Sequence, residues 1–421
     1  MKNILKILFI SFGWGCIDSV EVELWDECYH IDTTFIIDLP NSGLTGEIPP
    51  QIGQLINLSY LNLFENNLSG QIPEEIGDLV NLTHLELDHN NLSGTIPYQI
   101  GNLINLTHLE LDHNQLTGNI PSEIGNLINL NHLGLYVNQL TGQIPVELWN
   151  LTNLNSLVLL DNQLVGQIPS DISNLINLEY LYLGFNSFNG SIPQEISNLS
   201  NLKDLILISN NFSGEILPYL TEMENLIFLV LGGNNFSGEI PTEIDNLINL
   251  EEFNLWGNYF SGSLPEEIGN LASLQRLWID GNNFSGSLPQ SLTQLENIYS
   301  INISFNQFSG LIPETICDLG LDWTQWDNEV TNGLQNNNFC PPYPSCLSVN
   351  EIGYQNTTEC SECSVLNGDT NNDNILDILD IVFTINCILI QNCNSCSDIN
   401  DDDIINIQDI ILMISEVLNN P

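Results

Sequence analysis

A 24-residue period governs most of this chain and limits what it can fold into. One full unit, LSYLNLFENNLSGQIPEEIGDLVN, begins at Leu58, and ten further units follow it at intervals of 24 residues. A weaker unit begins at Thr34, which makes twelve copies. Repeats of this kind stack so that each unit contacts only its neighbours, and a chain of 421 residues then needs no single compact core.

Each repeat predicts one short strand followed by turns. With the leading Leu as offset zero, apolar residues fall at offsets 3 and 5, which is the alternation of a half-buried strand. Asn stands at offset 8 in eleven copies, from Asn66 to Asn306, and Ser42 takes its place in the first. Stacking should align these amides into a column that satisfies backbone groups. The L-x-G-x-I-P step predicts turns, with an irregular one at Leu217-Pro218.

The charge balance excludes two classes of partner. The chain has 53 acidic and 4 basic residues, and two of the bases lie among its first six residues. Only Lys203 and Arg276 remain beyond that segment. Nucleic acids and anionic membranes are bound through Lys and Arg, so neither is expected as a partner.

Residues 1–15 predict a secretion signal peptide. A charged start and a short apolar segment precede residues 13–15, GWG. The apolar segment is too short to span a bilayer, and a buried first strand is the alternative interpretation. Ten cysteines suit an exported protein with disulfides. We expect residues 16–33 to form an N-terminal cap with Cys16 paired to Cys28, the alternative being a lipid anchor on Cys16.

Residues 34–321 resemble plant-type leucine-rich repeat proteins, because L-x-x-L-x-L-x-x-N-x-L-x-G-x-I-P recurs through the copies. The resemblance implies an α/β solenoid, a right-handed array of about twelve 24-residue repeats with a parallel sheet on its concave side. The sequence has neither a membrane span nor a kinase signature. It therefore resembles the ectodomain of the plant receptors alone.

The concave face of such an array presents the side chains at offsets 1, 2, 4, 6 and 7. Five of the six histidines fall there, in three adjacent repeats, with four carboxylates among them. Imidazoles in one column are close enough in principle to share a transition metal. The alternative is that duplication of NLTHLELDHN multiplied the histidines without a function. The column holds His84, His108 and His132, and the rest of the group is His89, His113, Glu86, Asp88, Glu110 and Asp112.

Later repeats place aromatic side chains on the same face. Exposed aromatics on a rigid sheet can anchor a protein partner or stack on sugar rings. The alternative is packing against one another along the strands, which covers apolar area without a ligand. The candidate ligand-binding residues are Tyr180, Tyr182, Phe185, Phe228, Trp256, Trp278 and Tyr299, with Phe305 beside them.

Residues 322–364 predict a Cys-rich C-terminal cap and a linker. The repeat frame fails from Cys317 onward, and residues 347–364 have the composition of a polar linker. Two disulfides are expected, with their pairing open, and a zinc site is the alternative. The four cysteines concerned are Cys317, Cys340, Cys346 and Cys360.

Residues 365–421 contain two acidic loops, GDTNNDNILDILD and SDINDDDIINIQD, each followed by an apolar helical segment. Oxygen donors at loop positions 1, 3, 5, 9 and 12, with the backbone carbonyl of position 7, match the donors that calcium prefers. We expect two structural Ca²⁺ ions. The predicted ligands are Asp369, Asn371, Asp373, Ile375, Asp377 and Asp380 in the first loop, and Asp398, Asn400, Asp402, Ile404, Asn406 and Asp409 in the second.

This pair of loops resembles a dockerin module, an EF-hand-like all-α domain that attaches secreted proteins to cohesins. Loop positions 10 and 11, which carry partner recognition in dockerins, are Ile378-Leu379 and Ile407-Gln408 rather than the usual Ser/Thr pair. The partner is therefore a cohesin-like or another scaffold protein. Disulfides among the remaining cysteines should stabilise this module. Cys363 could instead pair with a cysteine of the C-terminal cap. The remaining cysteines are Cys363, Cys387, Cys393 and Cys396.

These features predict a secreted or cell-surface-attached adaptor without enzymatic activity. The repeats would bind a protein or carbohydrate, and the C-terminal module would attach the chain to a scaffold. The alternatives are a non-catalytic component of an extracellular, cellulosome-like polysaccharide-degrading system, or an adhesin. Intrinsic hydrolysis is disfavoured because Glu86 and Glu110 would lie one strand apart on an open sheet, without a cleft that excludes water.

Overall fold

The computed structural model describes residues 16–323, 331–360, 368, 370, 376–390, 397, 399 and 405–419. The predicted signal peptide lies outside the described residues. The chain divides into two compact units. Unit 1 is Met1–Gly166 with Asp171–Ser187, and unit 2 is Gln167–Ser170 with Phe188–Pro421.

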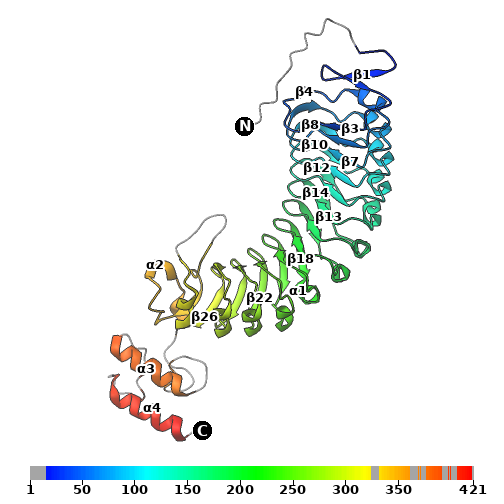
Figure 1. Cartoon of the computed structure of the whole chain (residues 1–421). Helices are drawn as coiled ribbons and strands as arrows, with labels where there is room; N and C mark the ends of the chain where they lie inside the picture. The colour runs from blue at the N-terminus through cyan, green and yellow to red at the C-terminus, as the bar shows by residue number, and fades with distance from the viewer. Residues whose placement is uncertain are drawn as a thin grey trace. The chain divides into compact units, whose positions relative to one another are not determined.

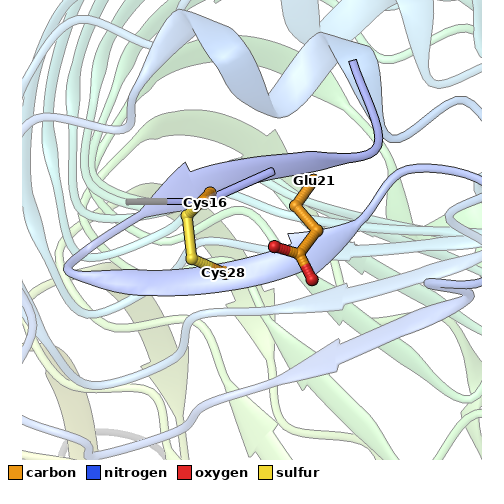
Figure 2. Close-up of side chains that lie close together, drawn as sticks. All are labelled: Cys16, Glu21 and Cys28. Atoms are coloured by element: carbon orange, nitrogen blue, oxygen red, sulfur yellow. A yellow bond between two sulfur atoms is a disulfide. The ribbon is translucent and has the colours of Figure 1, made fainter. Parts of the chain in front are cut away.

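A small antiparallel hairpin begins unit 1. Strand β1 (Glu21–Leu24) pairs with β2 (Glu27–His30), and Leu24 is fully buried. The Cys16–Cys28 disulfide joins the segment before β1 to β2, as Figure 2 shows, which confirms the predicted pairing. Glu21 lies nearby, and its Oε2 accepts a hydrogen bond from the Ile17 amide at 3.0 Å. The two sulfurs are bonded to each other, so neither is available as a thiolate ligand for a metal. The disulfide instead holds the N-terminal cap together.

The predicted strands form a parallel ladder in unit 1, and each residue pairs with the residue 24 positions later, as in Tyr60 with His84. Their inward Leu side chains, such as Leu61 and Leu85, are fully buried. These strands are β3 (Ile36–Asp38), β5 (Tyr60–Asn62), β7 (His84–Glu86), β9 (His108–Glu110), β11 (His132–Gly134), β13 (Ser156–Val158) and β15 (Tyr180–Tyr182).

A second parallel ladder occupies the L-x-G step, which the sequence predicted to be a turn. Its strands are β4 (Thr45–Gly46), β6 (Asn67–Gly70), β8 (Asn91–Thr95), β10 (Gln115–Asn119), β12 (Gln139–Gly142) and β14 (Gln163–Gly166). Short 3₁₀ helices then complete each repeat: η1 (Pro50–Gln54), η2 (Glu74–Asp78), η3 (Tyr98–Asn102), η4 (Ser122–Asn126), η5 (Val146–Asn150) and η6 (Ser170–Asn174).

The amide column forms as predicted. Asn90 Nδ2 donates to the carbonyls of Leu87 and Asp88 in its own repeat and of Leu63 in the repeat before, at 2.9–3.1 Å. Its Oδ1 accepts from the Leu68 amide at 3.0 Å. Each buried Asn therefore satisfies backbone groups of two repeats at the point where the strand ends.

Unit 2 repeats the same pattern. Its first ladder contains β17 (Asp204–Ile206), β19 (Phe228–Val230), β21 (Glu252–Asn254), β23 (Arg276–Trp278) and β25 (Ser300–Asn302). Its second ladder contains β16 (Ser187–Gly190), β18 (Asn211–Glu215), β20 (Asn235–Gly238), β22 (Tyr259–Ser263), β24 (Asn283–Gly286), β26 (Gln307–Leu311) and β27 (Asn338–Cys340). The 3₁₀ helices are η7 (Gln194–Asn198), η8 (Thr242–Asn246), η9 (Glu266–Asn270), η10 (Gln290–Gln294) and η11 (Glu314–Leu319).

The turn at Leu217-Pro218 is irregular, as predicted. A short α-helix, α1 (Leu217–Leu220), replaces the 3₁₀ helix there.

A continuous stack of phenylalanine rings runs through the core of unit 2. Neighbouring rings are nearly parallel, with centroids 6.0–6.4 Å apart. The same core position holds Leu in unit 1, for example Leu92 and Leu116. The stacked residues are Phe188, Phe212, Phe236, Phe260, Phe284, Phe308 and Phe339.

The repeat frame does not end at Cys317, which corrects the sequence prediction. Strand β27 pairs in parallel with β26, and Phe339 joins the ring stack. Asn337 enters the amide column, since its Nδ2 donates to the carbonyls of Ile303 and Leu334 at 3.0 Å. A partial thirteenth copy therefore follows the twelve, and the insertion before it, which places Asn337 31 residues after Asn306, hid it from a search for a fixed period.

Two disulfides close this end, Cys317–Cys346 and Cys340–Cys360. They resolve the open pairing, exclude a zinc site on these thiols and exclude a Cys360–Cys363 bond. Part of the expected linker belongs to the cap: α2 (Val349–Ile352) and η12 (Thr357–Glu359) follow β27. The Gln355 side chain donates to the Leu334 carbonyl at 2.9 Å.

The two apolar segments near the C-terminus form helices α3 (Ile378–Ile390) and α4 (Ile407–Asn419), which contact each other (Figure 1). Cys387 on α3 is disulfide-bonded. The other three cysteines expected here, Cys363, Cys393 and Cys396, lie outside the described residues. Among the described residues, no helix has both the length and the apolar character needed to cross a membrane.

Candidate functional site

Three groups of side chains outside the repeat core can take part in recognition: an arginine and aromatic group in unit 2, a histidine and carboxylate group in unit 1, and the two C-terminal helices. The first two lie on the concave face, at the offsets predicted to be outward. In unit 2 the register pairs Glu252 with Arg276 and Arg276 with Ser300, so these three side chains are neighbours on β21, β23 and β25.

Arg276 is held on the concave face by two neighbouring strands. Its Nη2 and Nε lie 2.6 and 2.8 Å from Glu252 Oε2. Its Nη1 donates to the Tyr299 hydroxyl at 2.7 Å, and the guanidinium carbon lies 5.8 Å from the Tyr299 ring centroid. The paired guanidinium is fixed in position, so it can meet a ligand with little loss of side-chain entropy.

Trp256 lies over a floor of glycine. A Cβ atom on Gly232 would collide with the indole, and one on Gly233 would lie 3.2 Å from Trp256 Cη2. Gly233 also has a φ of 65°, which a side chain would strain. The indole remains 37% exposed, so one face packs on backbone and the rest is open to solvent.

Trp278 lies one strand farther along, and its Nε1 donates to Ser300 Oγ at 2.8 Å. Ser300 Oγ in turn donates to the Thr331 carbonyl at 3.0 Å. The polar atom of this half-buried indole is thus satisfied within the protein, and its ring edge supplies apolar surface.

The structure divides the seven candidate aromatic residues between the two units. Tyr180 and Tyr182 pack edge to face in unit 1, with centroids 6.4 Å apart, and Phe185 is 52% exposed. Phe228 is half-buried on β19 in unit 2. Of the other three candidates, Trp278 lies on β23, Trp256 follows the end of β21, and Tyr299 directly precedes β25.

Two features of this group were missed by sequence reasoning. Arg276 was counted as a charge and not as a site residue, although it is one of only two basic residues after residue 15. The glycines at offset 7 in three successive repeats, Gly233, Gly257 and Gly281, were a visible signal for an open floor.

The histidines of unit 1 form two columns. In one, His84 stacks on His108 with centroids 4.4 Å apart, and His108 lies 6.3 Å from His132. In the other, His89 and His113 stack with centroids 4.0 Å apart. The first column was the predicted metal position; there, the Nδ1 atoms of His84 and His108 each lie 3.0 Å from a neighbouring threonine hydroxyl.

Carboxylates lie between the two columns. His132 Nε2 is 2.7 Å from Glu110 Oε1, and His113 Nδ1 is 3.0 Å from Asp112 Oδ2. Glu86 Oε1 accepts from the Tyr60 hydroxyl at 3.1 Å. An open hollow of about 490 Å³ is lined by Phe64, Glu86, Asp88, His108, Glu110, Asp112, His132 and Tyr136.

Burial disturbs the protonation of this group. Desolvation, and then the nearby charge of Asp112, raise the pKa of Asp88. Burial also raises the pKa of Glu110, against the opposing effect of His132. Burial lowers the pKa of His108, as do His84 and His132 beside it. Burial and the Asp112 carboxylate raise the pKa of Tyr136 to about 12, so its phenol stays protonated.

The structure describes only part of the predicted calcium loops. Asp380 is fully buried, and its two oxygens accept from the amides of Thr370 and Asp377 at 2.8 Å each. Asp409 is also fully buried and accepts from the amides of Ile399 and Asn406 at 3.0 and 2.8 Å. The other predicted ligands, Asp369, Asn371, Asp373, Ile375, Asp398, Asn400, Asp402 and Ile404, lie outside the described residues.

Each C-terminal helix carries an exposed apolar stripe. The two stripes have the same spacing, and each member of the first has an isoleucine or leucine counterpart 29 positions later. Such contiguous apolar surface is typical of an interaction site. The exposed residues are Ile378 (68%), Val382 (48%), Ile385 (39%) and Leu389 (74%) on α3, and Ile407 (69%), Ile411 (59%), Ile414 (40%) and Leu418 (74%) on α4.

The sequence pattern of the leucine-rich repeat region family matches residues 37–167 and 161–311. A comparison with curated proteins finds no match.

Three solved structures illustrate the likeness. The crystal structure of a TDR receptor is 30% identical, with a TM-score of 0.68 over 77% of this chain and 59% of that one. The complex of PEPR1 with AtPEP1 is 31% identical, with a TM-score of 0.61 over 72% of this chain and 52% of that one. The plant peptide hormone receptor RGFR1 in complex with RGF2 is 29% identical, with a TM-score of 0.51 over 72% of this chain and 59% of that one. This chain thus spans between 52% and 59% of the matched chains.

Proposed function

The chain belongs to the leucine-rich repeat family, and from this premise we propose that it is a secreted, non-enzymatic binding protein with two contact surfaces. The concave face recognises a peptide segment. The C-terminal helical module attaches the chain to a protein scaffold and depends on calcium for its fold.

The observation that carries peptide recognition is the fixed group of side chains on and directly beside β21, β23 and β25 of unit 2. Arg276 is held by Glu252 and Tyr299 and can pair with a carboxylate or carbonyl oxygen of a ligand. Trp256 on its glycine floor and Trp278 offer rigid apolar surface. Two of the similar structures are complexes, RGFR1 with RGF2 and PEPR1 with AtPEP1, and this supports a peptide over a sugar.

Peptides selected from a random linear display library against the immobilised full-length protein test this proposal. Trp256→Ala and Arg276→Ala should each weaken binding of the selected peptides about tenfold or more, as for anchor residues of an interface. Arg276→Lys should also weaken it, because Lys cannot reproduce the two-atom contact with Glu252. Isothermal titration calorimetry provides the measurement.

Tyr259→Ala is the matched control. Tyr259 is 58% exposed and belongs to the same repeat as Trp256, but it lies on the second ladder instead of the concave face. This variant should bind like the unchanged protein. Peptide binding that survives both Trp256→Ala and Arg276→Ala would contradict the proposed site. If the protein binds sugars on a glycan array and the peptide selection yields no binder, the concave face recognises carbohydrate, which favours a role in a polysaccharide-degrading system.

Attachment through the C-terminal module is supported by the duplicated apolar stripes of α3 and α4. Apolar side chains exposed at one helical spacing on both helices cost solubility unless a partner covers them. Cation binding is supported by the composition of residues 365–421, which contain no Lys or Arg, and by the burial of the loop carboxylates Asp380 and Asp409.

The test of attachment is recovery of a scaffold protein from the secreted fraction of the source cells with the full-length chain as bait. Val382→Asp combined with Ile411→Asp places a charge in each stripe and should abolish recovery of a partner that the unchanged chain retains. Val349→Asp is the control, since Val349 is 83% exposed on α2, outside the module. If the Val382→Asp/Ile411→Asp variant recovers the partner as well as the Val349→Asp control does, the partner does not bind the apolar stripes and the proposed attachment surface is wrong.

A further inference from the structure

Two imidazoles and two carboxylates meet in unit 1, at the ends of the strands β7 and β9. His89 and His113 occupy equivalent positions in adjacent repeats and have φ angles of 53° and 47°. This left-handed backbone brings the two rings into a stack, with centroids 4.0 Å apart and planes 20° apart. Asp88 and Asp112 precede them in the chain.

The donor atoms of this group converge. Asp112 Oδ2 lies 3.0 Å from His113 Nδ1 and 3.7 Å from His89 Nδ1. Asp88 Oδ2 lies 3.1 Å from His89 Nδ1. In a tetrahedral zinc site with bonds of about 2.1 Å, neighbouring donor atoms are about 3.4 Å apart. The observed spacings lie on both sides of this value. Because the two rings are stacked with planes 20° apart, one imidazole must rotate out of the stack for both Nδ1 lone pairs to point at one ion.

The charge of the surroundings also favours a cation. Residues 16–187 contain no Lys or Arg, so histidines and bound cations are the positive charges available to the buried carboxylates of this segment. The side chain of Asp112 is only 3% exposed, and that of Asp88 is 13% exposed. The two histidines are 39% and 38% exposed, so an ion can reach their rings from solvent.

We propose that His89, His113 and Asp112 bind one divalent transition-metal ion such as Zn²⁺, with Asp88 as a neighbouring carboxylate beside His89. Imidazole nitrogen with carboxylate oxygen suits zinc, copper or nickel, whereas calcium and magnesium prefer oxygen donors alone. Within the described part of the chain, the other group of candidate donors at comparable spacing is Cys16, Glu21 and Cys28, whose sulfurs are joined in a disulfide.

The site lies in the second histidine column and not in the one that the sequence first suggested. In the column of His84, His108 and His132, the ring centroids of His108 and His132 lie 6.3 Å apart, and Glu110 is engaged by His132 Nε2 at 2.7 Å. A metal held by His89 and His113 would join two successive repeats at the margin of the concave face.

The test uses the full-length protein, stripped with a chelator and returned to millimolar calcium so that the C-terminal loops are occupied. Calorimetric titration with ZnCl₂ should give one site. His89→Asn and His113→Asn should each weaken zinc binding about tenfold or more, and Asn tolerates the left-handed backbone of both positions. The visible absorption spectrum of the Co²⁺ form should report tetrahedral nitrogen and oxygen coordination.

His84→Asn is the matched control, because His84 stacks in the neighbouring column and contributes nothing to the proposed set. It should bind Zn²⁺ like the unchanged protein, and circular dichroism melts should show that all variants fold. Asp112→Asn, which keeps the size of the side chain, should weaken binding as the histidine variants do. The proposal is overturned if no saturable Zn²⁺ binding occurs, or if His84→Asn loses the metal while His89→Asn and His113→Asn retain it.

Discussion

Phe339 stacks on Phe308 with ring centroids 6.3 Å apart and planes only 1° apart. This contact joins the last regular repeat to the C-terminal cap, and the Cys340–Cys360 disulfide follows it directly. The cap is therefore part of the repeat core and not an appendage of it.

Replacing Phe339 by Ala should destabilise this end of unit 2 by about 3–5 kcal/mol, because it removes a fully buried ring and leaves a cavity against Phe308. Phe339→Leu should cost far less, since Leu occupies the same core position throughout unit 1. Hydrogen exchange of the amides of β26 and β27 provides the measurement. Phe305→Ala is the control, because that ring is 54% exposed; equal effects of the two alanine variants would contradict the role of the stack.

Replacing Asn234 by Ala should cost about 2–4 kcal/mol, because several buried backbone groups would lose their partner at once. Asn234 Nδ2 donates to the carbonyls of Leu207 and Leu231 at 2.9 and 3.0 Å, and its Oδ1 accepts from the Phe212 amide at 3.0 Å. Thermal unfolding monitored by circular dichroism measures the loss. Asn249→Ala should shift the midpoint little, since Asn249 makes an exposed hydrogen bond to the Glu224 carbonyl. A shift no larger for Asn234→Ala than for Asn249→Ala would mean that water replaces the column.

The sequence predicted the strand ladder and the amide column because both follow from a local pattern that repeats without change. It missed the second ladder, since the L-x-G segment reads as a turn by itself and becomes a strand only when a neighbouring copy pairs with it. It also missed the partial thirteenth repeat, because an insertion moves Asn337 away from the expected spacing of 24 residues.

The candidate site was predicted less completely, for a related reason. The aromatic positions follow from the offsets. The packing position of the Trp256 indole, however, depends on the absence of side chains at Gly232 and Gly233 in the preceding repeat. The histidines were grouped by equal offset, whereas the left-handed backbone at His89 and His113 decides which nitrogen atoms approach Asp112. A repeat alignment groups residues at the same offset, so it does not reveal a contact between two residues at different offsets in neighbouring repeats.

The Asp280 carboxyl should give unit 2 a measurable pH dependence. Burial raises its pKa from 3.8 to about 6. The folded state therefore binds the Asp280 proton more tightly than the unfolded state. The stability that this protonation contributes is fully present below about pH 4 and is lost as the pH rises through about 6. Asp280→Asn should remove the effect and gain on the order of 1–3 kcal/mol relative to the unchanged protein at pH 8.

Thermal unfolding of both proteins between pH 4 and pH 8 provides the comparison, and the difference in midpoint should grow with pH. Asp318→Asn, at an exposed carboxylate on η11, controls for the loss of one negative charge from a highly acidic chain. If the two variants gain equally, the cause is overall charge and not the burial of Asp280.

Removing calcium should unfold the C-terminal helices and leave the repeats intact. Ligand binding to an acidic loop supplies its folding energy, so a chelator should expose the amides of α3 and α4 to exchange, while the ladders of both units stay protected. Asp380→Asn and Asp409→Asn should each reduce calcium affinity, because each removes charge from a buried carboxylate at the twelfth position of its loop. Asp318→Asn again serves as the control. Protection of α3 and α4 that survives chelation would refute the calcium prediction, whereas recovery on addition of calcium but not of magnesium would support it.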